Sequence, residues 1–446
     1  MPTEIVLFTR DLRVHDHPAL TAAIAAAPNV TPLFVLDREI LASRYASANR
    51  LALLLDALRD LRGALRRRGG DLVVRRGDVV REVALLASRL GAERVHVSAD
   101  VSRYARRRTA GLRGIPGVEV VEHEGLTVVP SGSVTTTTGG AYRVFTPYWR
   151  RWQTMEPRRP HPAPDRLTLP DDVDPGVIPE LAELTDARPA PGRPPGGEDV
   201  GRAAAEAFFA ADADPGDRDR PAVDATSRLS LHLHLGTISP TELAVRADPT
   251  SAGQGAFVRQ LCWREFHVQL LAAEPRLVVD DLRPRGDRWI DDPDGFEAWI
   301  EGRTGYPLVD AGMRQLRTEG WMHNRARMVT ASFLTKHLRI DWRPGAWHFM
   351  DHLVDGDLAV NFGQWQWVAG TGTDPRPNRM LNPTAQSRRH DPQGAYLRRH
   401  VPELADVDDD LVHEPWSGGG PGPDGYPAPI VDHGWARGRF LAARGG

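Results

Sequence analysis

Short apolar runs alternate with amphipathic stretches along the first third of the chain. The stretches at 18–26, 49–68 and 79–90 place apolar residues three and four positions apart, as on one face of a helix. The runs between them have the length and composition of strands. Strands that alternate with helices form a parallel sheet with helices on both faces. We therefore predict one α/β domain that ends near residue 128, with strands at 4–8, 31–36, 72–75, 94–98 and 118–121.

The pattern changes twice after this domain. Residues 157–200 are rich in Pro, Gly and Asp and show no periodicity, which predicts a linker on the surface. From residue 201 onward the long patterns are helical, and no convincing strand follows. The predicted organisation is an α/β domain at 1–128, a connecting segment at 129–200 and a mostly helical domain at 201–446, with helices at 201–212, 255–273, 308–318, 322–338 and 344–354.

The predicted α/β domain lacks two common phosphate-binding sequences. It contains neither a Gly-x-Gly-x-x-Gly turn nor a Walker loop. An ordinary dinucleotide site in this domain is therefore disfavoured.

Charge is balanced over the whole chain but not locally. The 446 residues include 56 Lys and Arg against 59 Asp and Glu, and this net charge of −3 does not by itself suggest nucleic acid. However, residues 313–339 carry six basic side chains against Glu319, and residues 376–399 carry six arginines against Asp391. Such runs are either solvated faces or tracks for phosphate groups.

Cysteine usage and hydropathy bear on the location of the protein. Cys262 is the single cysteine, which excludes a disulfide within the chain and fits a reducing cytoplasm. The N-terminal MPTEIVLF has no basic region followed by a long apolar core, so we expect no signal peptide, and no apolar stretch approaches the roughly 18 to 20 residues of a membrane span. We expect a cytoplasmic protein that is not associated with a membrane.

The run from Asp355 to Trp367 gathers the most distinctive chemistry. It reads DGDLAVNFGQWQW, with two carboxylates, a carboxamide and two indoles, in a chain with only 7% aromatic residues. These groups suit a flat redox-active ligand, such as a flavin, that is hydrogen-bonded at its polar edge. Two other segments are ambiguous alone: Thr226–Ser230 is either a simple helix cap or a phosphate site, and Trp263–Phe266 is either core packing or functional.

Taken together, the motifs of this chain resemble those of the photolyase/cryptochrome flavoprotein family. TSRLS, WREF, TGYPLVDAGMRQL, GWMHNRARM, DGDLAVNFGQWQW, TGTD and NPTAQ occur in the family's order and spacing, and RDLRVHDHPAL resembles its opening signature. The similarity is greatest to class I photolyases, which split cyclobutane pyrimidine dimers. It implies an N-terminal α/β domain, a long connector and a helical domain that binds a U-shaped FAD.

The resemblance also implies the residues that bind FAD. Asp355 and Asp357 would contact the isoalloxazine and adenosine parts, and Arg327 would pair with Asp355, because a buried carboxylate without a partner is costly. Asn361 matches the position that faces the flavin N5 atom, where a neutral carboxamide is typical of photolyases. The implied cofactor-binding residues are Thr226, Ser227, Arg228, Leu229 and Ser230 at the phosphates, with Phe257, Arg264, Arg327, Asp355, Gly356, Asp357 and Asn361.

Three tryptophans match the family's electron relay. Trp365 would lie nearest the flavin, followed by Trp342 and then by Trp289 toward solvent. Any one of them alone could simply fill the core. With Asn361, these three are the predicted catalytic residues, and no metal ligand is predicted.

The implied partner is damaged DNA, duplex or single-stranded. Trp263 and Trp367 resemble two indoles that stack on a lesion flipped out of the helix, where the displaced bases need new apolar faces. Asn324 matches the dimer photolyases, whereas (6-4) photolyases carry a His at this position. The implied DNA-binding residues are Gln260, Trp263, Asn324, Arg325, Met328, Trp367 and Gln386.

Two residues depart from the pattern of dimer photolyases. Gln260 replaces a Glu that hydrogen-bonds the lesion, and Gln supplies neither a charge nor a proton. Phe362 replaces a usual second Asn. Gln260 is shared with (6-4) photolyases and animal cryptochromes. A cryptochrome-type photoreceptor and a (6-4) photolyase therefore stay open beside the leading hypothesis.

That hypothesis is a carbon–carbon lyase in which reduced FAD absorbs blue light and passes an electron to the dimer, which opens and returns it. The chain is expected to act as a monomer without a protein partner. Many members of the family also bind a light-harvesting antenna. Tyr104–Ala105 replaces the Asn-Glu pair of folate binders, so a deazaflavin-type antenna is favoured, at Phe34, Arg50, Asp100 and Tyr104.

Overall fold

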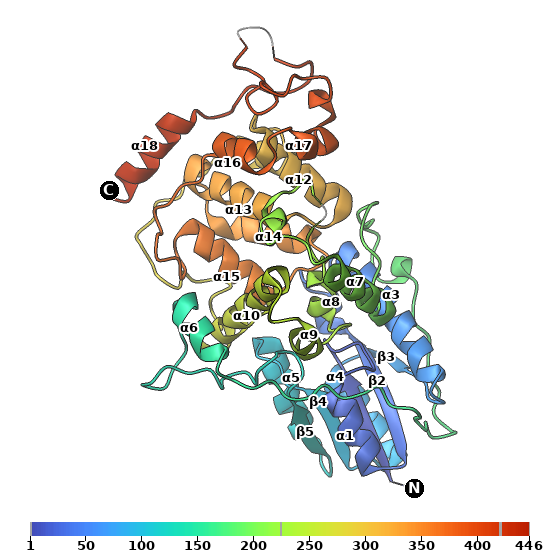
Figure 1. Cartoon of the computed structure of the whole chain (residues 1–446). Coiled ribbons are helices and arrows are strands. Elements are labelled where there is room, and N and C mark those ends of the chain that lie inside the picture. Colours follow the sequence, from blue (N-terminus) through green and yellow to red (C-terminus); the bar gives the residue numbers. More distant parts are fainter. Residues whose placement is uncertain (1, 224, 419–421, 446) are drawn as a thin grey trace. The chain divides into compact units, whose positions relative to one another are not determined.

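A computed structural model describes residues 2–223, 225–418 and 422–445. The chain forms two compact units (Figure 1). The first unit comprises Met1–Pro189, Pro194–Asp212 and Ser227–Pro275, and the second comprises Ala190–Arg193, Ala213–Thr226 and Arg276–Gly446. Helices that follow the linker in sequence therefore pack within the first unit.

The first unit is built on a five-stranded parallel sheet. Its order is β3-β2-β1-β4-β5, with bounds Thr3–Phe8 (β1), Asn29–Asp37 (β2), Val73–Gly77 (β3), Arg94–Ser98 (β4) and Glu119–His123 (β5). Every residue of β1 and β2 is buried, which explains their continuous apolar runs. All five predicted strands are confirmed.

Helices cover both faces of this sheet, as predicted. They are α1 (Pro18–Ala26), α3 (Ala48–Arg66), α4 (Val79–Leu90) and α5 (Arg103–Arg113), whereas the short α2 (Arg38–Leu41) after β2 buries no residue. Leu7 of β1 packs on one face with Val83 of α4 and Leu112 of α5. Because side chains alternate along a strand, Phe8 points to the other face, where its ring lies 4.6 Å from that of His17, the N-cap of α1.

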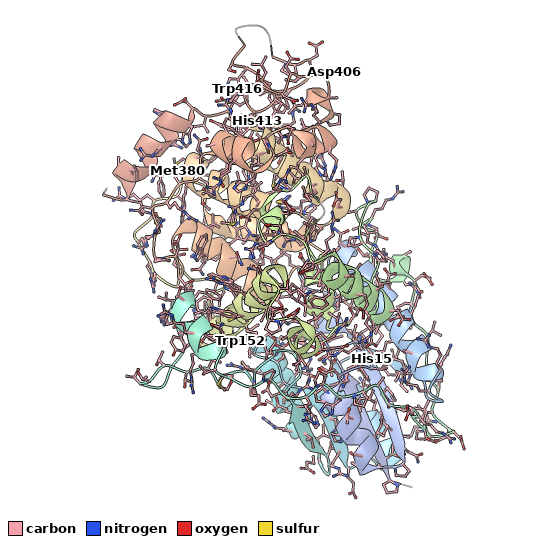
Figure 2. The ribbon with its side chains drawn as sticks, in the orientation of Figure 1. His15, Trp152, Met380, Asp406, His413 and Trp416 are labelled. Atoms are coloured by element: carbon pink, nitrogen blue, oxygen red, sulfur yellow. The ribbon has the colours of Figure 1, made fainter. Side chains whose placement is uncertain are left out.

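Besides a 3₁₀ turn at Leu181–Glu183, the segment predicted as a linker contains one complete α-helix. This helix, α6, is amphipathic and buries Phe145, Tyr148 and Trp152, the last of which is labelled in Figure 2. The remaining helices of the first unit are bounded as follows: α6 Phe145–Trp152, η1 Leu181–Glu183, α7 Glu198–Ala211, α8 Ser230–Leu235, α9 Pro240–Arg246 and α10 Ala252–Ala273.

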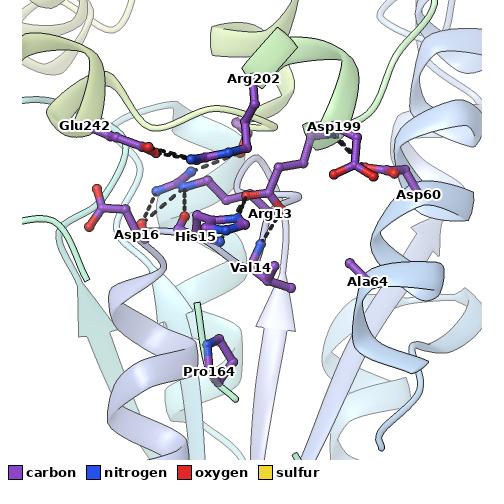
Figure 3. Close-up of polar contacts among 12 residues, drawn as sticks. Arg13, Val14, His15, Asp16, Asp60, Ala64, Pro164, Asp199, Arg202 and Glu242 are labelled. Carbon is purple, nitrogen blue, oxygen red and sulfur yellow. Dashed lines mark hydrogen bonds and ion pairs between the residues drawn. The ribbon is translucent and has the colours of Figure 1, made fainter. Parts of the chain in front are cut away.

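Buried polar contacts tie the turn after β1 to the helices of the same unit (Figure 3). The fully buried Arg13 donates to the carbonyls of Gly236 at 2.9 Å, Gly125 at 3.0 Å and Asp16 at 2.8 Å. Glu198, at the start of α7, accepts from the backbone N–H of Val14 at 2.7 Å. The opening RDLRVHDHPAL motif is thus a structural junction.

The second unit is helical, and no strand is assigned among its described residues. Its elements are η2 Asp217–Asp219, α11 Pro293–Glu301, α12 Pro307–Glu319, α13 Asn324–Ser332, the π-helical η3 Phe333–Leu338, α14 Trp342–His352, α15 Leu358–Ala369, α16 Pro383–His390, α17 Ala395–His400, η4 Pro402–Leu404 and α18 His433–Ala443. The single helix predicted at 322–338 is therefore α13 continued by a π-helical turn. No helix in the described part of the chain is both long and apolar enough to cross a membrane.

Candidate active site

Asp355 and Arg327 form an ion pair in the second unit. Arg327 Nη2 donates to Asp355 Oδ2 at 2.9 Å, and Arg327 Nε donates to the Met322 carbonyl at 2.7 Å, which fixes the guanidinium. The predicted pair is therefore present in the structure. Asp355 Oδ1 is buried and has no hydrogen-bond partner among the described residues. A buried acceptor of this kind needs a donor. The N–H edge of a flavin ring would supply one, so this carboxylate fits the cofactor that the motifs imply.

The start of α15 explains two further polar residues of the same motif. Asp357 caps the helix, because its Oδ1 accepts from the N–H of Val360 at 3.0 Å. One turn later, Asn361 is buried, and its Nδ2 donates to the carbonyl of Ala346 at 3.0 Å. This bond fixes the plane of the carboxamide and leaves its Oδ1 as an acceptor.

The three predicted relay tryptophans have different surroundings. Trp365 is buried in α15, and its Nε1 has no hydrogen-bond partner among the described residues. Trp342 is fully buried, donates from Nε1 to Asp281 at 2.9 Å and lies 4.7 Å from the guanidinium carbon of Arg343. Trp289 is half-buried. Electron transfer along them stays a prediction.

Trp365 also contacts aromatic residues that the sequence did not single out. Its ring meets that of Phe349 edge-on at 4.9 Å and that of Trp299 at 6.1 Å. Trp299 is fully buried in α11, and its Nε1 donates to the carbonyl of Thr330 at 3.0 Å. A lone Trp in an amphipathic helix carries no signal that separates it from ordinary core.

Phe362 lies in the core of the second unit. It is fully buried, and its ring contacts those of Trp342 at 6.2 Å and Trp347 at 5.1 Å, both edge-on. The replacement of the family's usual Asn by Phe is thus accommodated by aromatic packing.

The predicted DNA-binding residues of the second unit fall into two groups. On α13, Asn324 Nδ2 lies 3.9 Å from Met328 Sδ. Arg325 forms an ion pair with Asp219 at 2.9 Å, and its Nη1 lies 3.5 Å from Gln386 Oε1. The second group is at the end of α15, where Trp367 is half-buried.

The guanidinium carbon of Arg379 lies 5.4 Å from the centre of the Trp367 ring. Arg379 itself is exposed. The sequence placed Arg379 only within a basic run, because a contact with the indole depends on how the segment 374–380 folds back. The structure therefore adds Arg379 to the candidate site.

In the first unit, Trp263 of α10 is stacked on Phe145 of α6. The two ring centres are 3.6 Å apart and the rings are inclined by only 7°. Gln260, one turn before Trp263, is exposed. Because α6 lies within the predicted linker, the sequence did not indicate Phe145.

Glu265 anchors the same region of the first unit. It accepts from Trp152 Nε1 at 2.7 Å and from the backbone N–H of Val128. Burial, only partly offset by these hydrogen bonds, raises the pKa of Glu265 to about 7. Glu265 therefore fastens both α6 and the segment that precedes it to α10.

The predicted phosphate-binding segment precedes the short helix α8. Arg228 adopts a left-handed backbone conformation with φ of 49°, and the N–H of Leu229 donates to Ser227 Oγ at 3.4 Å. Arg264 donates to the carbonyls of Leu126 at 2.7 Å and Leu233 at 3.3 Å. Phe257 packs against the ring of Phe208 at 5.1 Å. Cofactor contacts of these residues, and of Gly356, stay predictions.

Three of the four predicted antenna residues lie at the carboxyl end of the sheet or on the helices that follow it. Asp100, just after β4, pairs with Arg10 at 3.5 Å. The Tyr104 hydroxyl donates to Asp37 at the end of β2, and burial raises its pKa. Arg50, in the first turn of α3, donates to the Tyr45 carbonyl at 3.0 Å, whereas Phe34 lies within β2. The strand order reverses between β1 and β4, which is where such sheets bind ligands.

Comparisons with known proteins agree with the geometry. A model of DNA photolyase matches residues 4–165, and a model of the FAD binding domain of DNA photolyase matches residues 257–445. A deoxyribodipyrimidine photo-lyase from Streptomyces griseus is 49% identical over 100% of both chains. A class III photolyase from Agrobacterium tumefaciens superposes with a TM-score of 0.92 at 35% identity, covering 100% of this chain and 97% of that one. A cryptochrome from Synechocystis superposes with a TM-score of 0.90 at 27% identity, with 99% of each chain covered.

Proposed function

Because this chain belongs to the DNA photolyase family, we propose that it is a light-driven lyase that uses FAD to split cyclobutane pyrimidine dimers in DNA. The observation that supports this best is the Asp355–Arg327 pair, whose free carboxylate oxygen is buried beside the helix that carries Asn361, Trp365 and Trp367. The assignment to class I stays a prediction, since one solved photolyase that superposes well, that of Agrobacterium tumefaciens, is of class III.

The residues of the second unit have distinct proposed roles toward the cofactor. Reduced FAD, when bound, supplies the photoexcited electron that opens the cyclobutane ring and takes it back. Asp355 would accept a hydrogen bond from the ring edge of the bound cofactor, and Arg327 balances the charge of Asp355. Asn361 presents a neutral oxygen whose orientation is fixed by Ala346. Trp365 would be the residue from which a bound flavin takes an electron during photoreduction.

Each unit carries an indole that we propose as a contact for DNA. Trp263 is held flat by Phe145 and would stack on a displaced base. Trp367 carries Arg379 on its ring and would contact the lesion with a cation beside it. Asn324 offers amide groups to the bases, whereas Arg325 would have to share its guanidinium with Asp219.

The test is repair of defined lesions. Chemically reduced protein is illuminated with an oligonucleotide that contains one cyclobutane dimer or one (6-4) product, and restored thymines are counted against a dark control. We expect dimer repair only. Photoreduction of the flavin without repair of either lesion would overturn the proposal and favour a photoreceptor.

The relay can be tested apart from repair. Trp365→Phe should abolish photoreduction of oxidised flavin but leave repair by chemically reduced protein in place, because the electron for the lesion comes from the flavin itself. Trp347→Phe is a matched control on a neighbouring helix. Unchanged photoreduction in the Trp365 variant would contradict the proposed path.

We propose the photoreceptor as the second candidate, supported by the similarity to a cryptochrome and by Gln260. Phe362 does not add to that case, because it is buried in the core.

Gln260→Glu should raise the yield of dimer repair if the position contacts the lesion.

We further propose a deazaflavin-type antenna at Phe34, Arg50, Asp100 and Tyr104. The ion pair of Asp100 and the hydrogen bond of Tyr104 hold these two side chains at the carboxyl end of the sheet. The visible absorption spectrum of the purified protein should contain a second chromophore beside the flavin, which the Asp100→Ala variant should lose. A spectrum of flavin alone would contradict this assignment.

A further inference from the structure

A lysine is buried in the π-helical segment of the second unit. Lys336 is 1% exposed. Its Nζ donates to the carbonyls of Pro377 at 3.0 Å and Arg379 at 2.6 Å. Both acceptors belong to the single segment 374–380, which links α15 to α16. An ammonium group that bonds two main-chain carbonyls of one segment fixes the path of that segment.

Close packing confirms that this segment has little freedom. A Cβ atom on Gly370, at the end of α15, would lie 2.4 Å from the carbonyl oxygen of Pro377. Asp374 Oδ1 accepts from the N–H of Arg376 at 2.7 Å, and the N–H of Leu381 donates to Ser332 Oγ at 3.4 Å. The segment is therefore packed against Gly370 and bonded by Lys336 in its middle, and the residue that follows it, Leu381, is bonded to Ser332.

The fixed segment determines where one exposed cation lies. The guanidinium of Arg379 is placed against the Trp367 ring, and the carbonyl of Arg379 is one of the two that Lys336 binds. A guanidinium on an indole keeps its N–H groups free at the ring edge, where a phosphate is accessible to them. Lys336 thus bonds the main chain of Arg379, and the side chain of Arg379 is the one that lies on the indole.

We propose that Lys336 is a positioning residue that holds the segment 374–380 so that Arg379 lies on Trp367 and contacts a DNA phosphate next to the lesion. The inference rests on the proposed function and adds to it a buried residue that does not touch DNA. It also gives the basic run 376–399 a specific member, Arg379, as a phosphate contact.

Charged groups around Lys336 make this arrangement sensitive to pH. Burial is the main cause that lowers the pKa of Lys336 to about 7, and the cations Arg444 and Arg379 lower it further, whereas Asp374 and Asp287 raise it. The ring of Phe440, from α18, lies 5.6 Å from Nζ and brings no charge. As the pH rises through about 7, the amine loses its proton and its bonds to the two carbonyls weaken.

A double-mutant cycle tests the proposal. Affinities for dimer-containing DNA are measured at 0.1 M salt for wild type, Lys336→Met, Arg379→Ala and the double variant, with flavin content as the check of folding. Loss of one phosphate contact should weaken binding about eightfold at this salt concentration and flatten the salt slope by about 0.9. We expect Arg379→Ala to show this loss, Lys336→Met to show much of it, and the second substitution to add less than about twofold to the first.

The proposal would be overturned if Lys336→Met weakened DNA binding equally in wild type and in the Arg379→Ala variant. It would also be overturned if Lys336→Met did not change the affinity for DNA. If Lys336→Met does not fold, wild type and Arg379→Ala are compared between pH 6.5 and 8.5. The affinity of wild type should fall more steeply than that of the variant, and parallel curves would overturn the proposal. Failure of wild type itself to prefer or repair damaged DNA would instead refute the proposed function.

Discussion

The ion pair between Arg327 and the buried Asp355 shows how one side chain fixes another. Removing the arginine leaves a buried carboxylate without its cation, so Arg327→Met should lower the free energy of unfolding by about 3 kcal/mol and reduce the bound flavin. The double variant Arg327→Met, Asp355→Asn removes the charge as well and should recover part of this stability. Urea unfolding and flavin absorbance measure both effects. If Arg327→Met were as stable as wild type, the ion pair would not contribute to the free energy of unfolding.

Glu265 gives the protein a pH dependence of the opposite sign to that of most acids. Its pKa in the folded protein is raised to about 7, above its ordinary value of 4.5, so the folded state binds the proton more tightly. Between about pH 4.5 and 7 this contribution to stability is lost as the pH rises, by about 3 kcal/mol over the full window.

Glu265→Gln should therefore flatten the pH dependence of stability. The variant is also less stable at low pH, because its single acceptor oxygen cannot serve both Trp152 and Val128. Unfolding midpoints of both proteins at pH 5 and pH 7.5 check this expectation. If the midpoints of the two proteins changed by the same amount between pH 5 and pH 7.5, the expectation would be contradicted.

Among the elements, helix α6 acts as a backing for α10. Phe145 covers the Trp263 ring, and Gln269 Nε2 donates to the carbonyl of Tyr142 at 2.7 Å. Phe145→Leu keeps an apolar side chain but removes the flat surface, so Trp263 gains rotamers that it must lose again on binding.

We expect Phe145→Leu to weaken binding of dimer-containing DNA about threefold to tenfold, with smaller effects on undamaged DNA. Val144→Ala is a matched control, because Val144 is exposed next to Phe145 in the chain. Fluorescence anisotropy with the two kinds of DNA measures the difference. An equal loss for both DNAs would argue against a role in presenting Trp263.

The elements that the sequence predicted are those whose apolar periodicity reflects burial in their own neighbourhood. The strands and the helices α1, α3 and α4 belong to this group. In contrast, α5 (RYARRRTAGLR) is dominated by arginines, and α6 (FTPYWRRW) is short and contains a proline. The burial of α6 depends on α10, which lies about a hundred residues later in the chain.

The same distinction applies to the candidate site. Arg327 with Asp355 was predictable because both lie in motifs, and a buried acid needs a partner. Lys336, Arg379 and Trp299 were not, because their roles depend on main-chain carbonyls and ring contacts that no local pattern encodes. Motifs identify which residue types are present. The folded chain determines which of their polar groups are occupied by intramolecular contacts and which are available to a ligand.

Over the whole molecule, the basic runs 313–339 and 376–399 are less available to phosphates than their charge indicates. Half of their basic side chains are engaged within the second unit: Lys336 is buried, and five arginines pair with acids, as in Arg314–Glu403, Arg325–Asp219, Arg327–Asp355, Arg388–Glu414 and Arg398–Asp409.

The salt dependence of DNA binding should therefore be moderate. If at most about six phosphates are neutralised by these runs, the plot of log K against log salt should have a slope no steeper than about −5. Titrations between 50 and 300 mM salt measure it. A slope near −10 would mean that the ion pairs open when DNA binds.

The contacts of Arg13 also affect how the protein folds during its synthesis on the ribosome. Arg13 and its acceptor Gly236 are separated by 223 residues. At about 5–20 residues per second, roughly 10 to 45 s pass after the synthesis of Arg13 before that acceptor exists. During this time the Arg13 guanidinium lacks the Gly236 carbonyl that completes its set of acceptors. We therefore expect the N-terminal third to reach its full stability only after the chain has been extended beyond residue 236.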